Sequence, residues 1–230
     1  MKKIASAFLI ILIANLLTSS TQAQDIRFGL TASPSINWFA PETEDYNSEG
    51  LRIGFSYGLL TEFLMAEHYG FASGMKIMHM GGKLSFPVSE LADGLLYQEK
   101  DRIYKLQYLE IPLTLKMKTR EIGYNTYFGV FGFGGGINLR ARADDKFTNT
   151  QTNQTFTRND IDIKSEIPFF RASMILGIGL EHSLGGNTSL VGGLVFNNGF
   201  TNTLKGTNMV NNKKQNARAN YIEISLGVLF

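Results

Sequence analysis

Long stretches of this chain alternate residue by residue between apolar and polar side chains, and this pattern constrains the fold more than any other feature. Leu51 and Ile53, for example, lie on one side of an extended strand, and Arg52 lies on the other. Such alternation predicts β-strands. Eight segments show it: 26–38, 51–65, 70–82, 104–118, 124–140, 166–181, 187–200 and 218–230. The chain is therefore expected to be all-β, with strands much longer than the roughly 5–6 residues usual in globular sheets.

The connections between these segments alternate in length. Three are short, at 66–68, 119–123 and 182–187. The other four are long and polar, at 39–50, 83–103, 141–165 and 201–217. Short turns at one rim and long loops at the other are typical of an outer-membrane barrel, whose turns are periplasmic and whose loops are extracellular. Because a tilted strand crosses the hydrocarbon with about 9–11 residues, the expected fold is an eight-stranded antiparallel up-and-down transmembrane β-barrel.

The first residues fit export from the cytoplasm. Lys2 and Lys3 precede an apolar stretch at 4–17, and a small-residue cleavage site follows. This stretch is shorter than the roughly 20 residues that a membrane-spanning helix needs. We therefore expect residues 1–23 to be a cleaved signal peptide and residues 24–230 to form the barrel, in the outer membrane of a Gram-negative bacterium.

Composition argues against disulfides, a lipid-modified cysteine and nucleic-acid binding. The chain has no cysteine, so neither a disulfide nor a lipid-modified cysteine is expected. Once the leader is removed, basic and acidic side chains are equal in number. A neutral chain gives no electrostatic reason to bind nucleic acid.

Alternation alone does not decide which side of each strand faces inward, since a soluble barrel would place its apolar side chains inside. The leader, the sorting of the connections and the strand lengths favour lipid against the apolar side and a polar lumen. Eight strands leave an interior just wide enough for side chains to fill. Nine charged residues are then expected in the lumen: Arg27, Arg52, Glu62, Lys76, Glu110, Lys116, Arg171, Glu181 and Glu223.

Tracing the strands alternately up and down sorts most of these charges into two heights. Toward the periplasmic rim lie Arg27, Glu62, Lys116 and Glu181. Near mid-height lie Lys76, Glu110, Arg171 and Glu223. Each layer has as many positive as negative charges, and buried charges are costly unless they are paired. We therefore expect a structural plug of ion pairs that blocks solutes, with Lys76 and Glu110 in contact across adjacent strands.

Aromatic residues are expected to form two girdles at the membrane interfaces. The upper girdle would comprise Trp38, Phe39, Tyr46 and Tyr104. The lower girdle would comprise Tyr69, Phe71, Tyr124, Tyr127 and Phe230.

Signals for catalysis are weak. The glycine-rich run at 132–136 lacks the Lys-Ser/Thr and the following helix of a phosphate-binding loop. His68 and His182 fall in short turns, at the wrong rim for an enzyme that modifies outer-leaflet lipid. His79 is expected to face lipid, with no nucleophile or orienting acid placed beside it. No metal-ligand spacing occurs, so we expect no enzyme, no cofactor and no metal.

Two stretches resemble a known family. YLEIPLTLKMK at 108–118, followed by GVFGFGGGINL at 129–139, is similar to the PorT-like outer-membrane β-barrel domain family. In that family a YLEIP-type strand precedes a short turn and a glycine-rich strand. The resemblance extends over about residues 27–230 and implies an eight-stranded outer-membrane barrel without known catalytic residues. The namesake of the family is associated with the type IX protein secretion system and gliding.

The last strand, YIEISLGVLF, is similar to the strand that the barrel-assembly machinery recognises, so this machinery is an expected partner during insertion. Our leading interpretation is a small, porin-like, monomeric barrel with a plugged lumen, surrounded by outer-membrane lipid, whose loops serve structural or interaction roles. The loop at 141–165 is rich in Thr, Asn and Asp, which is typical of segments that order only on meeting a partner. Other envelope or secretion-complex proteins are candidate partners. Three alternatives stay open: an accessory component of a type IX secretion system, a narrow channel, and a lipid-modifying barrel enzyme.

Overall fold

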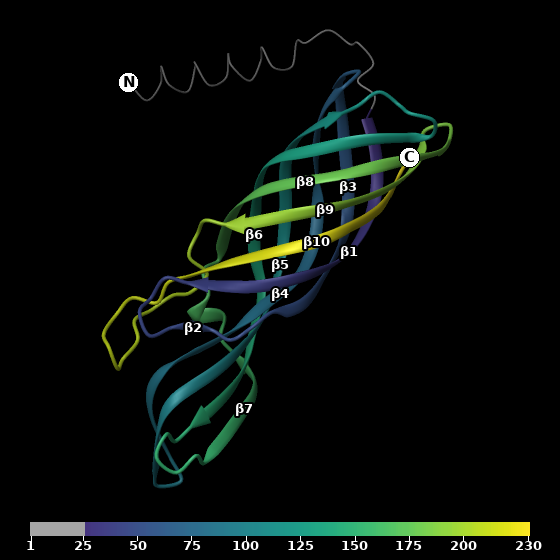
Figure 1. Ribbon diagram of the computed structural model, residues 1–230. Coiled ribbons are helices and arrows are strands. Elements are labelled where there is room, and N and C mark those ends of the chain that lie inside the picture. The colour runs from purple at the N-terminus through teal and green to yellow at the C-terminus, as the bar shows by residue number, and fades with distance from the viewer. Residues whose placement is uncertain (1–25) are drawn as a thin grey trace, which may run out of the picture.

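A computed structural model describes residues 26–230, which form a closed antiparallel barrel (Figure 1). The wall has eight strands: β1 (Ile26–Pro41), β3 (Arg52–Ala66), β4 (Tyr69–Ala92), β5 (Leu95–Lys118), β6 (Asn125–Thr148), β8 (Phe170–Gly185), β9 (Thr188–Gly199) and β10 (Ala217–Leu229). Each wall strand pairs with the next along the chain, and β1 closes the barrel by pairing with both β3 and β10. The predicted fold class is therefore confirmed.

Three smaller elements lie at the long-loop end: β2 (Asn47–Ser48), β7 (Thr155–Asp162) and the 3-10 turn η1 (Lys164–Glu166). Within residues 26–230, no helix is both long and apolar enough to cross a membrane. The predicted signal peptide lies outside the described residues.

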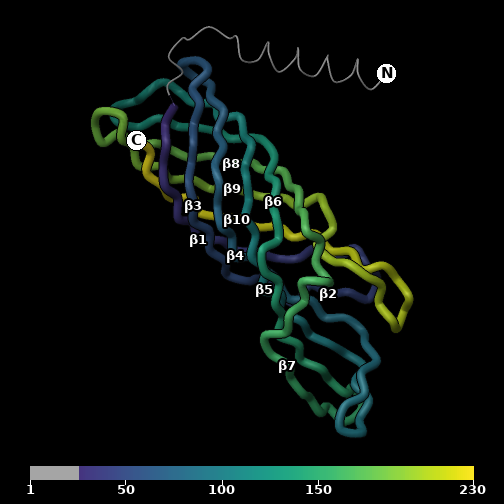
Figure 2. Tube along the Cα trace, turned by 180° about the vertical axis from the view of Figure 1, so that it is seen from behind, coloured from purple at the N-terminus to yellow at the C-terminus, as the bar shows by residue number. Residues whose placement is uncertain are grey.

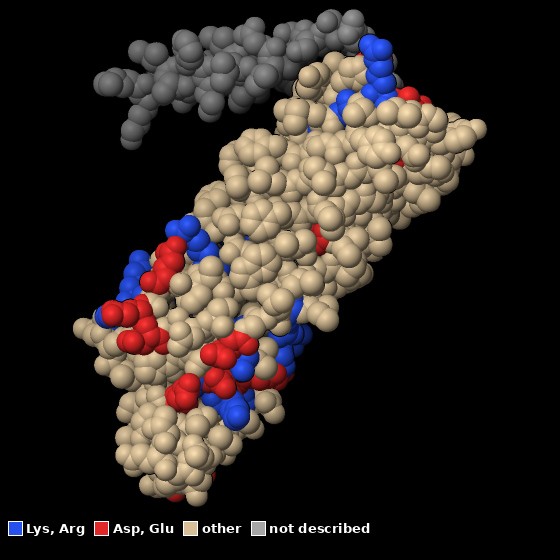
Figure 3. Space-filling model, in the orientation of Figure 1, with Lys and Arg blue, Asp and Glu red and all other residues tan. Residues whose placement is uncertain are grey.

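The side chains of the wall alternate between lipid and lumen. On β3, Ile53 and Leu59 point outward and are 83% and 52% exposed, whereas Ser56 points inward and is 1% exposed. The same alternation runs along β1, where Ser33 and Ser35 are buried between exposed neighbours. The result is an outer band with few charges, and on the face seen in Figure 3 most Lys, Arg, Asp and Glu side chains lie above and below this band. This band suits contact with acyl chains.

Three strands extend far beyond the barrel, and here the loop predictions are wrong. β4, β5 and β6 have 24 residues each. Much of the expected loop at 83–103 is a hairpin that turns at Asp93 and Gly94, which have φ angles of 50° and 75°. Two consecutive positive φ angles match the hairpin turn that Asp-Gly favours. The expected loop at 141–165 likewise contains the end of β6 and all of β7, which pair in register.

Together, residues 83–103 and 141–162 form a four-stranded sheet that we call the extension. It projects from one end of the barrel, with β7 at its edge (Figures 1 and 2). Aromatic contacts tie its strands together: Phe156 stacks on Phe147 with 4.5 Å between ring centroids and meets Tyr97 edge-on at 4.6 Å. Strand pairing and aromatic packing within the extension therefore account for its order in the structure.

The mouth of the barrel beneath the extension is filled by apolar side chains, which we call the cap. The principal members are Phe39, Tyr46, Leu84, Phe86, Tyr104, Ile163, Ile167 and Leu204. Tyr46 stacks on Phe86 at 4.7 Å, and Phe39 meets Tyr104 edge-on at 5.1 Å. The cap also explains why β8 starts at Phe170 and not at the predicted residue 166, since the preceding segment turns inward to bury Ile163 and Ile167.

The cap corrects the prediction of an upper aromatic girdle. Phe39, Tyr46 and Tyr104 are no more than 5% exposed and therefore do not face lipid. At the short-turn end, exposed aromatic side chains do ring the barrel: Tyr69, Tyr124, Tyr127 and Phe230.

Candidate functional site

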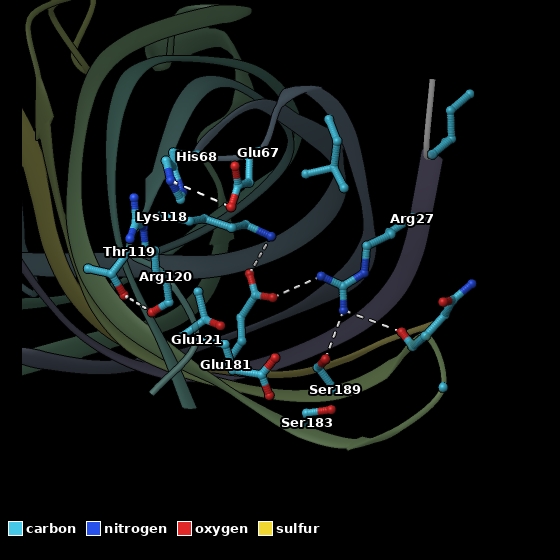
Figure 4. Close-up of a pocket in the computed structure, with 15 residues that line it drawn as sticks. Arg27, Glu67, His68, Lys118, Thr119, Arg120, Glu121, Glu181, Ser183 and Ser189 are labelled. Atoms are coloured by element: carbon cyan, nitrogen blue, oxygen red, sulfur yellow. Dashed lines mark hydrogen bonds and ion pairs between the residues drawn. The ribbon is translucent and has the colours of Figure 1, made fainter. Parts of the chain in front are cut away.

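The lumen at the short-turn end opens into a vestibule of about 440 Å³, shown in Figure 4. Arg27 from β1 and Lys118 from β5 reach toward Glu181 of β8. Arg27 Nη1 lies 2.8 Å from Glu181 Oε2, and Lys118 Nζ lies 2.7 Å from Glu181 Oε1. The Arg27 guanidinium also donates a hydrogen bond to Ser189 Oγ at 2.9 Å.

Beneath these residues, Lys116 and Glu62 complete a first ionic layer. Lys116 Nζ forms an ion pair with Glu62 and lies 2.6 Å from Glu181 Oε1. It also sits 4.1 Å from the ring centroid of Phe128, a cation–π contact. Glu62, Lys116 and Glu181 come from three different wall strands, β3, β5 and β8, so the layer ties the barrel together across its lumen.

Lys118 belongs to this layer although the sequence analysis did not name it. Its Nζ lies 3.0 Å from Glu62 Oε2 as well as near Glu181, and its side chain is 8% exposed. The layer therefore has three positive and two negative side chains and is not balanced. The alternation along β5 could have predicted this position, because Lys118 follows Lys116 by two residues and its side chain therefore faces the same side of the strand.

A second ionic layer lies at mid-height around Glu110. Its carboxylate accepts a hydrogen bond from the Tyr221 hydroxyl at 2.9 Å and lies 3.3 Å from Arg171 Nη1 and 3.4 Å from Lys76 Nζ. Lys76 is closer to Glu223, at 2.9 Å. All five side chains are almost completely buried.

Hydrogen bonds between charged side chains and neutral groups complete the second layer. Arg171 Nη2 donates to Asn197 Oδ1 at 2.6 Å and to the Ala219 carbonyl at 2.9 Å, and Ser56 Oγ donates to Glu223 at 3.2 Å. Sequence reasoning missed Tyr221 and Asn197 as partners because a neutral polar side chain on an inward-facing position carries no distinguishing pattern. Between the two layers remains a cavity of about 100 Å³.

The barrel interior has room for these side chains because β6 is rich in glycine. A Cβ on Gly132 would lie 2.1 Å from the Leu113 carbonyl oxygen, and one on Gly134 would lie 2.8 Å from Ser173 Oγ. The glycine run therefore serves close packing within the wall and lumen.

Arg52 departs from the prediction that it belongs to the lumen network. Its guanidinium leaves the lumen and donates a hydrogen bond to the Tyr104 carbonyl at 3.0 Å. Two features open this route: β3 and β4 stop pairing above Phe55 and His79, and Gly81 has no side chain to block the passage. Arg52 therefore lines a cavity on the outer wall and not the lumen.

A third ionic cluster lies in the extension. Arg102 donates two hydrogen bonds to Asp145, at 2.6 and 2.7 Å, and forms an ion pair with Glu166. Lys100 Nζ lies 2.8 Å from the same Asp145 carboxylate. Burial acts to raise the pKa of Asp145, but the hydrogen bonds and charges of Arg102 and Lys100 outweigh it and hold this pKa below its ordinary 3.8. Asp145 is therefore charged at neutral pH and holds β5 and β6 together.

The three histidines have different surroundings. His182 Nδ1 is hydrogen-bonded to Asn125 at 2.9 Å, and His68 lies 3.9 Å from Glu67 at the short-turn end. His79 faces outward and stacks on Tyr57 with 6.2 Å between ring centroids. Within residues 26–230, no histidine ring is hydrogen-bonded to a serine or threonine hydroxyl, and no group of three or more acidic or histidine side chains is arranged to hold a metal.

Comparison with protein families shows to which family the chain belongs. Residues 22–205 match the family model of the outer membrane protein beta-barrel domain, which is well over half of the chain. The chain belongs to this family.

Membership implies an outer-membrane location. Outer-membrane barrels place their short turns in the periplasm, so we expect the turns at 67–68, 119–124 and 186–187 to face the periplasm and the cap and extension to face outward from the cell. On this orientation the vestibule with Arg27 and Glu181 is periplasmic.

Several solved outer-membrane proteins are similar to this outer-membrane barrel in fold. OprG from Pseudomonas aeruginosa is 10% identical with a TM-score of 0.46, covering 90% of this chain and 97% of that one. Neisserial surface protein A is 12% identical with a TM-score of 0.40, covering 88% and 95%. Ail of Yersinia pestis is 12% identical with a TM-score of 0.38, covering 89% and 98%. Similarities this distant say nothing of function, and no curated protein matches the chain.

Proposed function

We propose that this outer-membrane barrel is closed to solutes and acts by presenting its extension to a partner, in a structural or interaction role and not as an enzyme. The observation that carries the proposal is that β4, β5 and β6, each 24 residues long in total, continue beyond the barrel into an ordered sheet outside the membrane. A rigid scaffold that positions an exposed segment is the usual arrangement for recognition.

The closure of the lumen is supported by three successive obstacles. A solute that enters the vestibule meets the layer of Glu62 and Lys116, then the layer of Glu110, and then the apolar cap. Glu110 and Tyr221 are 1% and 0% exposed, so water reaches them poorly. In the second layer, two positive and two negative side chains also pair with one another, so these charges need no water for compensation.

Planar-bilayer recording tests this closure. We expect purified, folded protein to give no stable conductance above the bare bilayer. A reproducible open channel of fixed conductance would contradict the closed lumen and favour the narrow-channel alternative.

Site-specific photocrosslinking in intact cells tests the role of the extension. A photoreactive residue at Thr157 or Asn159, both exposed on β7, is expected to give an adduct of defined mass with an envelope protein. The matched control is Glu121, exposed in a periplasmic turn. Absence of adducts at both β7 positions, or the same adduct at Glu121, would count against recognition through the extension.

The resemblance of residues 108–118 to PorT-like proteins supports a second candidate, an accessory role in a type IX secretion system. The motif has a local explanation, however, because Tyr108 and Glu110 point into the lumen and are 1% exposed. Packing inside the barrel is thus enough to explain these residues of the motif, and no secretion role is needed. For this reason the secretion role is the second candidate. Cross-linked pulldown from intact envelopes distinguishes the two, since an accessory component should copurify with several secretion proteins in fixed proportion.

A further inference from the structure

The cavity that Arg52 enters lies on the outer wall, between the barrel and the base of the extension. It has a volume of about 250 Å³. Four of its lining side chains are basic: Arg52, Lys105, Arg140 and Arg142. We call it the rim cavity. The lumen network does not use it, and it gathers several positive charges beside the exposed apolar residue Ile53.

Strand pairing explains how the basic side chains converge. On β5 and β6, Lys105 is the direct partner of Arg142, and Gln107 is the direct partner of Arg140. A bulge next to Gln107 shifts β6 by one residue, so Arg140 turns outward where simple alternation from Asn138 would turn it inward. The Arg52 side chain reaches the rim cavity from β3 and passes next to Gly81.

The charges in the rim cavity are only partly neutralised within residues 26–230. Arg142 Nη1 lies 2.9 Å from Asp160 Oδ2, and Lys105 forms an ion pair with Asp144. Among the described residues, no carboxylate lies within ion-pair distance of Arg52 or Arg140, and the buried Nε of Arg142 has no hydrogen-bond partner. The cavity therefore retains positive charge and unused donors.

The rim cavity lies where the hydrocarbon of the membrane should end. On β5, the outward apolar row runs from Met117 to Leu109, which matches the roughly 9–11 residues of a tilted crossing. Gln107 and Lys105 are the next two outward positions. Directly beside the cavity, Ile53 is 83% exposed and lies at the head of the apolar row on β3.

We propose that the rim cavity binds the phosphate-bearing headgroup of a lipid in the outer leaflet. Guanidinium groups match the geometry of phosphate oxygens and bind them with two parallel hydrogen bonds. Arg52 and Arg140 supply the charge that is not already paired, and Arg142 supplies a free donor. The acyl chains of the same lipid lie along the apolar surface below Ile53. The positive charge of the cavity thus fits the phosphate of an anionic lipid, and the apolar wall below it fits the acyl chains. A free anion would use only the positive charge.

Native mass spectrometry of the folded protein in a neutral detergent tests the proposal. The probes are phosphatidic acid, which carries a phosphate monoester, phosphatidylcholine as a lipid without net charge, and inorganic phosphate. Wild-type protein should bind phosphatidic acid in preference to phosphatidylcholine. The double variant R52Q/R140Q should weaken binding of phosphatidic acid at least about tenfold, as expected for lost charge-assisted hydrogen bonds.

The control variant is R218Q, which removes an exposed arginine that pairs with Glu42 at the same end of the barrel but outside the rim cavity. It should bind phosphatidic acid like wild type. The single variant R140Q, whose side chain is exposed, keeps the test usable if the double variant does not fold. It should also weaken binding.

Equal binding of phosphatidic acid by wild type and R140Q would overturn the proposal, as would equal weakening by R218Q. Binding of inorganic phosphate as tight as that of phosphatidic acid would show a site for the free anion and would overturn the assignment to lipid.

Discussion

At the residue scale, Glu110 is the central acidic group of the ionic layer in the middle of the lumen. It lies within 3.4 Å of Lys76 and Arg171 and accepts a hydrogen bond from Tyr221. A buried ion pair adds little stability by itself, but removal of one partner leaves the other charge without compensation. The alternation of the sequence was enough to place Lys76, Glu110, Arg171 and Glu223 inside. It could not place Arg52, because the path of a long side chain depends on a local gap in the wall.

Glu110→Ala is expected to destabilise the folded barrel by about 3–5 kcal/mol, because Lys76 and Arg171 lose a shared counter-charge in a buried site. The midpoint of urea unfolding measures this loss. Glu121→Ala, in an exposed periplasmic turn, is the control and should change stability by less than about 0.5 kcal/mol. A Glu110→Ala protein as stable as the control would show that the network is dispensable.

Two glycines of the wall form a matched pair for a second test. A Cβ on Gly132 would meet backbone atoms of Leu113 and Thr114 at 2.1 and 2.6 Å, whereas one on Gly192 would meet nothing within 4 Å. Gly132→Ala should therefore cost about 1–3 kcal/mol through overpacking, and Gly192→Ala should be tolerated. Comparison of the two urea midpoints measures the difference, and equal midpoints would contradict the close packing of β5 against β6.

At the element scale, the extension is the feature that the sequence analysis interpreted least well. The segment at 83–103 was expected to be a loop because it is a long and polar connection between two alternating segments. Its Asp93-Gly94 dipeptide is nevertheless a strong hairpin signal, and the apolar residues on both sides of it support the same conclusion. The segment at 141–165 gave no comparable signal, because β7 has few apolar residues and is ordered mainly through its pairing with β6.

The lowered pKa of Asp145 predicts how the extension responds to acid. A carboxyl whose pKa is depressed in the folded state stabilises that state above its ordinary pKa of 3.8, and this stability is lost as the pH falls through the folded-state value. Asp145→Asn should therefore destabilise the protein by about 1.5–3 kcal/mol at pH 7. The difference from wild type should shrink below pH 3.8.

Urea midpoints of wild type and Asp145→Asn across this pH range measure the effect. Asp93→Asn serves as the control, because Asn-Gly suits the same turn and Asp93 forms no ion pair within residues 26–230. A difference between wild type and Asp145→Asn that is independent of pH would contradict the role of the Asp145 charge.

At the scale of the whole molecule, the closure that we propose for the barrel has two parts that rest on different physical means. The ionic layers close it from the periplasmic side, and the cap closes it from the extracellular side. The number of strands, their order and the sorting of the turns were predictable, because they depend on alternation and connection length. The cap was not, because it is assembled from side chains far apart in the sequence, such as Tyr46, Phe86 and Leu204.

Two independent seals predict that damage to one leaves the other intact. Leu204→Asp places a charge among the apolar side chains of the cap, where Leu204 is 3% exposed, and should loosen the extracellular mouth. The variant should still give no stable conductance in planar bilayers, because the layers around Glu62 and Glu110 remain. Channel opening by Leu204→Asp alone would show that the cap is the only effective barrier.

The continuity of β4, β5 and β6 has a mechanical consequence. β4 and β5 each run as one strand from the barrel to the turn at Asp93 and Gly94, with a register shift between Pro87 and Glu90. A tensile load applied at the tip would run lengthwise along the strands and shear many backbone hydrogen bonds at once, and would not peel them apart singly. Force applied at the tip would therefore be transmitted directly to the barrel wall, because the same strands form both parts.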